Sequence, residues 1–290
     1  MPDRPASPLN LMDWTPPTAR QRYFRRDTAF YALSIGGGHA PLDQASHALL
    51  DPWHPALQAL PSMALVLGYP GFWLGTREVE ALAGIRVSNV LHVEQSVTLH
   101  RPLPVEGDVE GTTRVTGLVD KGAERGSLLY SERTLRLHGE DTPLATCRQV
   151  HYLRGAGGMG NAGQATPPVP PPPAGPCDAA LDIQTRPEQA LLYRLNGDAN
   201  TLHIDPETAR GAGFERPILH GMCTVGIAVY SVLATLAAGR PSRMAGFAAR
   251  MMAPVLPGDR LRTEVWASGA FRTRVPDRGV VVAEGTTELP

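Results

Sequence analysis

The sequence predicts an α+β protein built from two similar halves, each with a long buried helix followed by an antiparallel sheet. Two apolar runs, residues 60–67 and 217–239, are the predicted buried helices. After each run come stretches in which every second residue is apolar, as expected for antiparallel strands with one buried face. These features recur in the same order at an offset of about 150–160 residues, which indicates a duplicated domain. Helices that cover one face of an antiparallel sheet define the α+β class.

Short motifs flank the apolar run in each half. In the first half, Tyr31-Ala-Leu-Ser-Ile35 precedes the run, and a segment that ends in Gly107-Asp108 follows it. In the second half, Tyr193-Arg-Leu-Asn-Gly197 and a segment that ends in Gly258-Asp259 occupy the matching positions. The strands predicted from alternation are residues 109–116, 127–137, 149–154 and 259–266.

A segment rich in glycine and proline separates the two halves. Residues 155–176 begin with Gly155-Ala-Gly-Gly-Met-Gly160 and continue into a proline-rich run from Pro167 to Pro173. The glycines match the GxGxxG pattern of dinucleotide sites, but such a site requires a helix next, and prolines follow instead. We therefore expect an extended linker that divides the chain into domains 1–154 and 177–290.

Charge and cysteine content limit the possible functions. The 290 residues carry a net charge of −1 and a pI of about 6.8, so a broad nucleic-acid-binding surface is not expected. The three cysteines, Cys147, Cys177 and Cys223, form no CxxC pair, which fits a reducing compartment and offers no structural zinc site. The N-terminus lacks the basic and apolar segments of a secretory signal. We therefore expect a cytoplasmic protein.

The second apolar run needs to be distinguished from a membrane span. Residues Pro217 to Gly239 contain no Asp, Glu, Lys or Arg, and this length approaches the ~20 apolar residues that a membrane helix requires. Small residues such as Gly221, Thr224 and Ser231 argue against membrane insertion. A helix that is apolar on all sides is also expected where a sheet wraps around it, so we predict a buried core helix.

The segment Asp198-Ala-Asn-Thr-Leu-His203 contains a carboxylate and an imidazole, with Asn200 between them. Asp205 and Pro206 then indicate the start of a helix, with Asp205 as its N-cap. Gly221 opens the buried helix shortly afterwards. An acid/base pair moves protons, and a glycine N–H at a helix N-terminus can hold negative charge on an oxygen. This combination is what a reaction that passes through an oxyanion requires.

Each of these residues also has a purely structural interpretation. Asp198 can cap a turn, His203 can be a buried core histidine, and Gly221 can be a packing glycine. Their coincidence in one short window favours the catalytic interpretation. We assign His220 only to the turn before the helix and Cys223 to the core, because no activating base is indicated near it. These two residues lack the further partners that a metal site needs, so no metal is expected.

Residues 193–206 and 212–224 make the chain recognisable, together with Val90-Leu-His-Val-Glu-Gln95 and Asp120-Lys-Gly122 in the first half. They resemble the (R)-specific enoyl-CoA hydratases of the MaoC-like, hydratase 2 group, which includes the hydratase part of peroxisomal multifunctional enzyme type 2. The resemblance covers nearly the whole chain. It implies a double hot-dog fold, in which each half is one hot dog and the second half carries the catalytic machinery.

The resemblance also implies roles for individual residues. Asp198 and His203 fall on the family's catalytic pair, Asn200 on its orienting asparagine, and Gly221 on its backbone oxyanion donor. The expected contacts with the CoA thioester and the acyl group fall on His92, Val93, Lys121 and Met251. Val93 stands where the family usually has glycine, and Met251 where it usually has an aromatic residue.

The implied reaction is the hydration of a trans-2-enoyl-CoA to a (3R)-3-hydroxyacyl-CoA by a hydro-lyase. Water adds at C3, the Gly221 N–H receives the charge on the thioester oxygen, and Asp198 and His203 serve both proton transfers from one face. Which of the two takes the first proton is left open. Neither step is redox, so no dissociable cofactor is expected, and the family resemblance implies a homodimer.

Two other functions remain open. One is a 3-hydroxyacyl dehydratase that acts on acyl carrier protein, and the other is a non-catalytic acyl-CoA-binding hot-dog module. In the first half, Gly36-Gly-Gly-His39 occupies the position of the catalytic segment without a carboxylate at the matching spacing. We therefore predict that this half is catalytically degenerate and accommodates a medium, long or bulky acyl chain.

Overall fold

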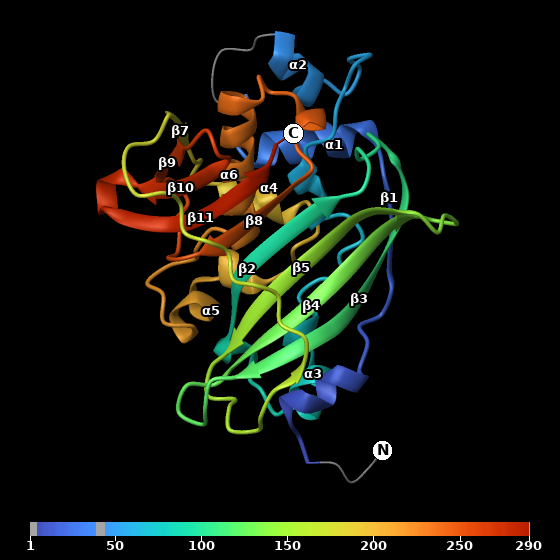
Figure 1. Ribbon diagram of the computed structural model, residues 1–290, viewed down its shortest axis with the longest axis vertical. Helices are drawn as coiled ribbons and strands as arrows, with labels where there is room; N and C mark the ends of the chain where they lie inside the picture. The colour runs from blue at the N-terminus through green and yellow to red at the C-terminus, as the bar shows by residue number, and fades with distance from the viewer. Residues whose placement is uncertain (1–4, 39–43, 290) are drawn as a thin grey trace.

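The computed structural model describes residues 5–38 and 44–289. One eleven-stranded antiparallel sheet runs through both halves of the chain (Figure 1). The first half contributes, in spatial order, β1 (Ala19–Tyr23), β3 (Gly107–Asp120), β4 (Ser127–Leu137), β5 (Pro143–Leu153) and β2 (Val90–Leu99). The second half continues with β8 (Gly246–Met251), β11 (Val280–Glu288), β10 (Ala270–Val275), β9 (Arg260–Val265) and β7 (Ala179–Gln184). The predicted strands are confirmed, and each half is one block of neighbouring strands.

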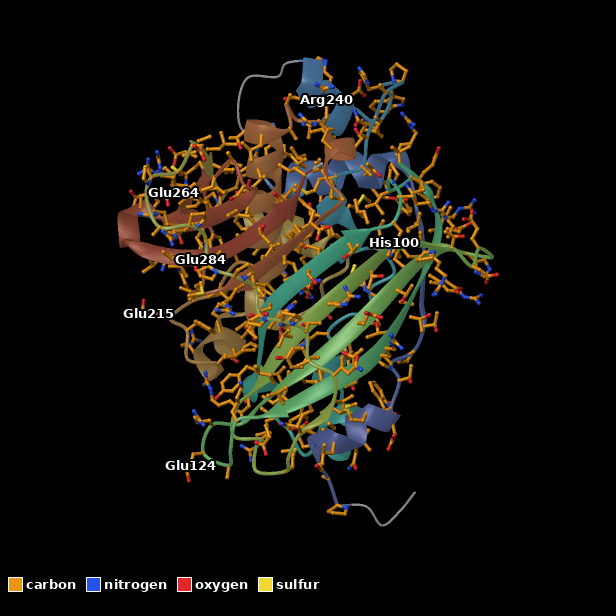
Figure 2. All side chains as sticks on the ribbon, viewed as in Figure 1. His100, Glu124, Glu215, Arg240, Glu264 and Glu284 are labelled. Atoms are coloured by element: carbon orange, nitrogen blue, oxygen red, sulfur yellow. The ribbon has the colours of Figure 1, made fainter. Side chains whose placement is uncertain are left out.

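The two halves join where β2 pairs with β8. Glu94 lies opposite Arg250 in this register, and Arg250 Nε donates a hydrogen bond of 2.8 Å to Glu94 Oε1. The outer face of the second-half strands continues this charged row, because Arg272 pairs with Glu284 and Arg274 with Glu264, both at 2.8 Å (Figure 2). Charged residues thus cover one face of the sheet, which leaves the other face to pack on the core.

The helices are distributed over both halves: the helix at residues 221–236 packs on the second-half strands, and the helix at residues 77–83 lies in the first half (Figure 1). They are α1 (Arg25–Ser34), α2 (Gln44–Leu50), α3 (Arg77–Ala83), α4 (Gln189–Arg194), α5 (Pro206–Gly211) and α6 (Gly221–Leu236). Helix α6 is buried along its length from Cys223 to Leu233 and packs against strands β7, β9 and β11. The prediction of a buried core helix is therefore confirmed. Among the residues that the structure describes, no helix has the length and hydropathy needed to span a membrane.

The prediction of a long buried helix in the first half is wrong. The run 60–67 forms only a short 3-10 helix, η2 (Pro61–Leu65). Gly68 follows in a left-handed conformation, with φ of 55°, and this conformation does not continue a helix. Arg133 from β4 donates to the main-chain oxygens of Ala64 and Leu65 at 2.9 and 3.0 Å and also to that of Leu67. The buried guanidinium therefore satisfies carbonyl groups that a longer helix would have used internally.

The glycine-rich segment between the halves folds around an aspartate. The Asp120 carboxylate accepts hydrogen bonds from the main-chain N–H groups of Gly122, Gly158 and Gly160, at 2.7–2.9 Å. The only regular structure in 155–176 is the two-residue strand β6 (Ala162–Gly163), which pairs with β3. No helix follows Gly160 in this fully described segment, in keeping with the choice of a linker over a dinucleotide site.

Candidate active site

A short loop between α4 and α5 carries the predicted catalytic pair. The Asn200 N–H donates to Asp198 Oδ1 at 3.0 Å, and the Leu202 N–H donates to Asn200 Oδ1 at 3.1 Å. Arg194 from α4 donates to the main-chain oxygen of Asn200 at 3.1 Å. Asp205 then caps α5, as predicted, by accepting from two N–H groups of its first turn. These consecutive turns fix the backbone on both sides of Asp198, and the main-chain N–H of Asn200 holds its carboxylate; an orienting role for the Asn200 side chain stays a prediction.

His203 ends the same loop and turns its ring into the protein. It lies in the 3-10 helix η5 (Thr201–His203), is buried, and places Nδ1 2.9 Å from the main-chain oxygen of Ile218. A carbonyl oxygen only accepts, so Nδ1 carries the hydrogen and Nε2 is left as an acceptor. Burial lowers the pKa of His203, against the opposing effects of the Ile218 bond and Asp198. The ring is therefore a neutral base at physiological pH.

His220 completes this group of side chains, although the sequence indicated only a turn residue. It is the N-cap residue of α6, and its ring centroid lies 3.8 Å from that of His203, with the planes at 30°. Ligand atoms of Asp198, His203 and His220 all lie within 4.8 Å of one another. Burial lowers the pKa of His220 to about 2, with a smaller contribution from His203. The only sequence signal for this residue was its position next to Gly221.

The same three side chains are candidate metal ligands by type and distance. That the protein uses no metal stays a prediction.

Gly221 is the first residue of α6, where the N–H groups have no partner within the helix. A Cβ atom at this position would overlap Sδ of Met251, the last residue of β8. The structure thus brings Met251, a predicted binding residue, against the predicted oxyanion donor. A side chain at this position would displace the thioether of Met251.

The first half contributes a residue that the sequence did not reveal. Tyr69 follows η2, and burial together with the nearby charge of Asp198 raises its pKa. Gln149 hydrogen-bonds the phenol, and the Arg133 guanidinium lies 5.5 Å from the centre of the Tyr69 ring. Tyr69 therefore stays neutral and is one of the first-half residues near the catalytic loop, together with Ser34, whose hydroxyl accepts a 2.9 Å hydrogen bond from Asn196 Nδ2.

His92 and Val93 lie at an irregularity in β2. His92 pairs with His151 and Glu94 pairs with Val150, so Val93 is the extra residue of a β-bulge. The His92 ring stacks on His151 at 4.6 Å, and burial lowers the pKa of His92 to about 4. Bulges are frequent beside functional sites because they redirect side chains.

Lys121 is exposed in the turn between β3 and β4, next to Asp120 and its glycine-rich loop. Figure 2 shows Glu124 of the same turn projecting at one end of the molecule. His92 contacts His151 and Glu94, and Lys121 contacts Arg125 and Gly126, all within the first half. The role of His92, Val93 and Lys121 in binding stays a prediction. His39, the first-half counterpart in the sequence argument, lies outside the described residues.

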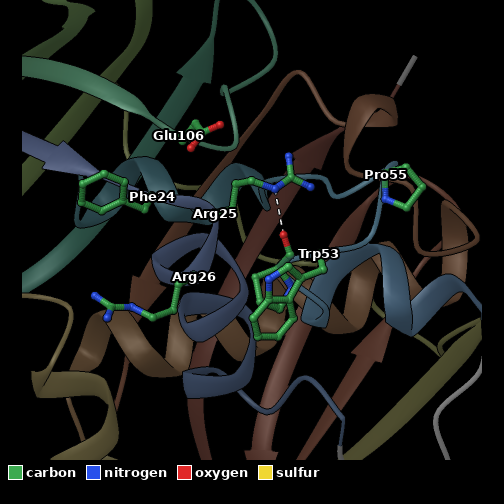
Figure 3. A pocket seen from close by; sticks show the side chains of 7 residues that line it. Phe24, Arg25, Arg26, Trp53, Pro55 and Glu106 are labelled. Atoms are coloured by element: carbon green, nitrogen blue, oxygen red, sulfur yellow. Dashed lines mark hydrogen bonds between the residues drawn. The ribbon is translucent and has the colours of Figure 1, made fainter.

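An open groove elsewhere on the surface has a volume of about 570 Å³ and contains none of the eight predicted site residues. Figure 3 shows Phe24, Arg25, Arg26, Trp53, Pro55 and Glu106 around it. The dashed line marks the 2.8 Å hydrogen bond from Arg25 Nε to the main-chain oxygen of Pro52. The groove is therefore separate from the candidate active site.

We predict that acid pH destabilises the fold through the buried histidines. Burial lowers the pKa of His151, His203 and His220 below the value of about 6.5 expected in the unfolded chain. Below pH 6.5 the unfolded chain therefore binds more protons than the folded one. The free energy of unfolding then decreases as the pH is lowered. Each histidine that stays neutral contributes at most about 1.4 kcal/mol per pH unit. Urea denaturation at pH 7.5 and 5.0 measures this loss, and equal stability at both values would contradict it.

Both halves match known family models. Residues 22–155 match the MFE-2 hydratase 2 N-terminal domain, and residues 169–288 match the MaoC like domain. The Arabidopsis thaliana protein named peroxisomal enoyl-CoA hydratase 2 is 35% identical over 94% of this chain and 92% of its own length. The chain belongs to the MaoC-like hydratase 2 family. The resemblance of the sequence motifs is thereby confirmed.

Solved structures agree with the hydratase 2 assignment. A MaoC-like dehydratase from Phytophthora capsici matches with a TM-score of 0.81 and 29% identity, over 97% of this chain and 98% of that one. A Mycobacterium tuberculosis protein described as having a double hot-dog fold matches with a TM-score of 0.54 and 16% identity, over 94% of both chains. The double hot-dog fold expected for a hydratase 2 chain is confirmed, and residues 5–38 and 44–154 of its first hot dog contain no helix as long as α6.

Proposed function

We propose that this protein is an (R)-specific 2-enoyl-CoA hydratase. It adds water to a trans-2-enoyl-CoA to give the (3R)-3-hydroxyacyl-CoA, and acts as a dehydratase in reverse. The observation that carries the proposal is the joint orientation of His203 and Asp198. Nδ1 of His203 is engaged by Ile218, so Nε2 is available beside the Asp198 carboxylate and the start of α6. The hydratase and dehydratase names of the family members described above support the same reaction.

Each step of the reaction has a group in this site. As water attacks C3, Asp198 or Nε2 of His203 takes a proton, and negative charge moves onto the thioester oxygen. The Gly221 N–H can receive that oxygen, and one such donor contributes about 3–4 kcal/mol to transition-state stability. A proton then passes to C2 from the same face, which gives syn addition. Asp198 and His203 act together in both proton transfers, and either of them can take the first proton.

The acyl chain is proposed to extend into the first half. Its central helix is replaced by the short helix η2, so the inner face of its strands is not covered by a helix as long as α6. We propose medium, long or bulky acyl chains on this basis. Lys121 is proposed to attract a CoA phosphate, and the CoA ester is proposed over an acyl-carrier-protein ester.

The remaining features of the function stay proposals. We propose a homodimer with no nucleic-acid partner, no membrane insertion and no dissociable cofactor. A cytoplasmic location fits the three cysteines, which are all unpaired. The alternative that is not an enzyme is an acyl-CoA-binding module. Such a module would not need a pair of residues that transfers protons, so the presence of Asp198 and His203 favours the hydratase.

The test measures the loss of enoyl-thioester absorbance with crotonyl-, octenoyl- and dodecenoyl-CoA. Coupling to an (R)-specific 3-hydroxyacyl-CoA dehydrogenase identifies the product. We expect (3R) product, faster turnover of the longer chains, and a KM for CoA esters that rises in Lys121→Ala while the KM for the matching pantetheine esters does not. Release of free CoA would indicate a thioesterase. Turnover of acyl-carrier-protein esters alone would indicate a 3-hydroxyacyl-acyl-carrier-protein dehydratase. Binding of CoA esters without turnover would indicate the acyl-CoA-binding module.

A further inference from the structure

His220 is buried at the centre of the site without a protein partner. Its side chain is 1% exposed, and within the described residues neither Nδ1 nor Nε2 has a hydrogen-bond partner. A buried imidazole in this state costs free energy unless a water or a ligand completes its hydrogen bonds. The residue also lies immediately before Gly221, at the first turn of α6. One of its ring nitrogens lies within 4.8 Å of ligand atoms of Asp198 and His203, the residues to which the proton transfers are assigned.

The spacing of the three polar groups fits one shared oxygen atom. Asp198, His203 and His220 each place a ligand atom within 4.8 Å of the other two. Two groups that hydrogen-bond the same water lie about 4.6 Å apart, because each bond is about 2.8 Å long and the angle at the oxygen is near tetrahedral. A single water oxygen can thus contact all three side chains.

Without His220, Asp198 and His203 offer a bound water two hydrogen-bond acceptors and no donor. The Asp198 carboxylate only accepts, and the Nδ1 hydrogen of His203 is used by Ile218, which leaves Nε2 as an acceptor. A water between these two groups donates both of its hydrogens, one to Asp198 and one to His203, and accepts no hydrogen bond from either. The ring N–H of a neutral His220 supplies the missing donor.

We propose that His220 is a further catalytic residue that binds the oxygen added to C3. This inference rests on the proposed hydratase function. The water donates its two hydrogens to Asp198 and His203 and accepts one from His220, so a single lone pair remains to form the bond to C3. One O–H bond breaks as the C3–O bond forms, and the proton passes to the pair before C2 is protonated. In dehydration the C3–O bond breaks, and the same N–H stabilises the departing oxygen.

Two observations keep His220 in this role. Its ring is held between His203, at 3.8 Å, and Tyr193, at 5.1 Å, which fixes its direction. Burial lowers its pKa to about 2, so the ring keeps one N–H donor and does not compete with the pair for the proton.

The test compares His220→Phe, which keeps a stacked ring, with His220→Gln, which keeps a donor. We expect His220→Phe to lower kcat for hydration and dehydration 10- to 100-fold with little change in KM, and to leave Tm equal or higher because two unpartnered nitrogens are removed. Part of the rate should return in His220→Gln. Trp266→Phe is the control, since it removes another buried ring N–H without a partner, and its kcat should match the wild type.

The outcomes separate this inference from the proposed function. An active wild type with an equally active His220→Phe variant would overturn the role of His220 alone, whereas an inactive wild type would overturn the hydratase function itself. If the Phe variant does not fold, ¹⁵N spectra of histidine-labelled wild type decide the question, with signals assigned through His220→Gln. A shift of the His220 ring nitrogens on binding of (3R)-3-hydroxybutyryl-CoA supports the inference, and unchanged signals overturn it.

Discussion

Asp198→Asn is expected to lower kcat by about 10²–10⁴-fold, the contribution typical of a positioned acid/base group. The amide cannot take a proton from water, but its oxygen can still accept the 3.0 Å hydrogen bond from the Asn200 N–H. The loop therefore keeps its conformation, and the free energy of unfolding should change little. Turnover of crotonyl-CoA together with a thermal melt measures both quantities.

His203→Gln is expected to cause a loss of the same order, because the neutral amide has no basic nitrogen to replace Nε2. The double variant should lose little more than either single variant, since residues that act as one unit are strongly non-additive. Near-full activity of Asp198→Asn would show that the pair is not catalytic. Additive losses would show that the two residues act in separate steps.

Gly111→Val is expected to destabilise the first half by about 3 kcal/mol or more. Gly111 lies in β3, and a Cβ atom there would collide with the main-chain oxygen of Gly68 and lie 3.1 Å from Cδ of Arg133. The main chain at Gly68 and the side chain of the buried Arg133 cannot move away easily, because Arg133 is hydrogen-bonded to the main-chain oxygen of Leu67. Any accommodation would shift Gly68 and with it Tyr69, so residual folded protein should also turn over more slowly. Urea denaturation and the hydratase assay measure the two effects.

Thr112→Val is the matched control for this substitution. It introduces the same side chain one residue further along β3, at an exposed position on the other face of the strand. Its free energy of unfolding should stay within about 0.5 kcal/mol of the wild type. Equal stability of the two variants would mean that the contact between Gly68 and Gly111 does not limit the packing.

Features that depend on neighbours in sequence were predictable. The N-cap at Asp205, the start of α6 at Gly221 and the alternation in 127–137 all follow from local backbone chemistry and side-chain periodicity, and the structure has each of them. The loop from Asp198 to His203 also holds itself together through its own side chains. For this reason the candidate catalytic pair and its asparagine could be named from a single short segment.

Features that depend on contacts between distant segments were not predictable. The run 60–67 is apolar enough for a helix, but Arg133, which lies far along the chain, takes up the carbonyl groups at its end. The stacking of His220 on His203, the approach of Met251 to Gly221 and the proximity of Tyr69 to Asp198 likewise join separate elements.

By itself, the sequence determined the class of fold, the positions of four strands and the residue types of the candidate pair, because these follow from periodicity, capping and residue type. Only the tertiary structure decided which further groups surround the pair, which nitrogen of His203 is available, and that the run 60–67 does not form a long helix. Burial and hydrogen-bond partners set these properties, and both are created when residues distant in sequence pack together.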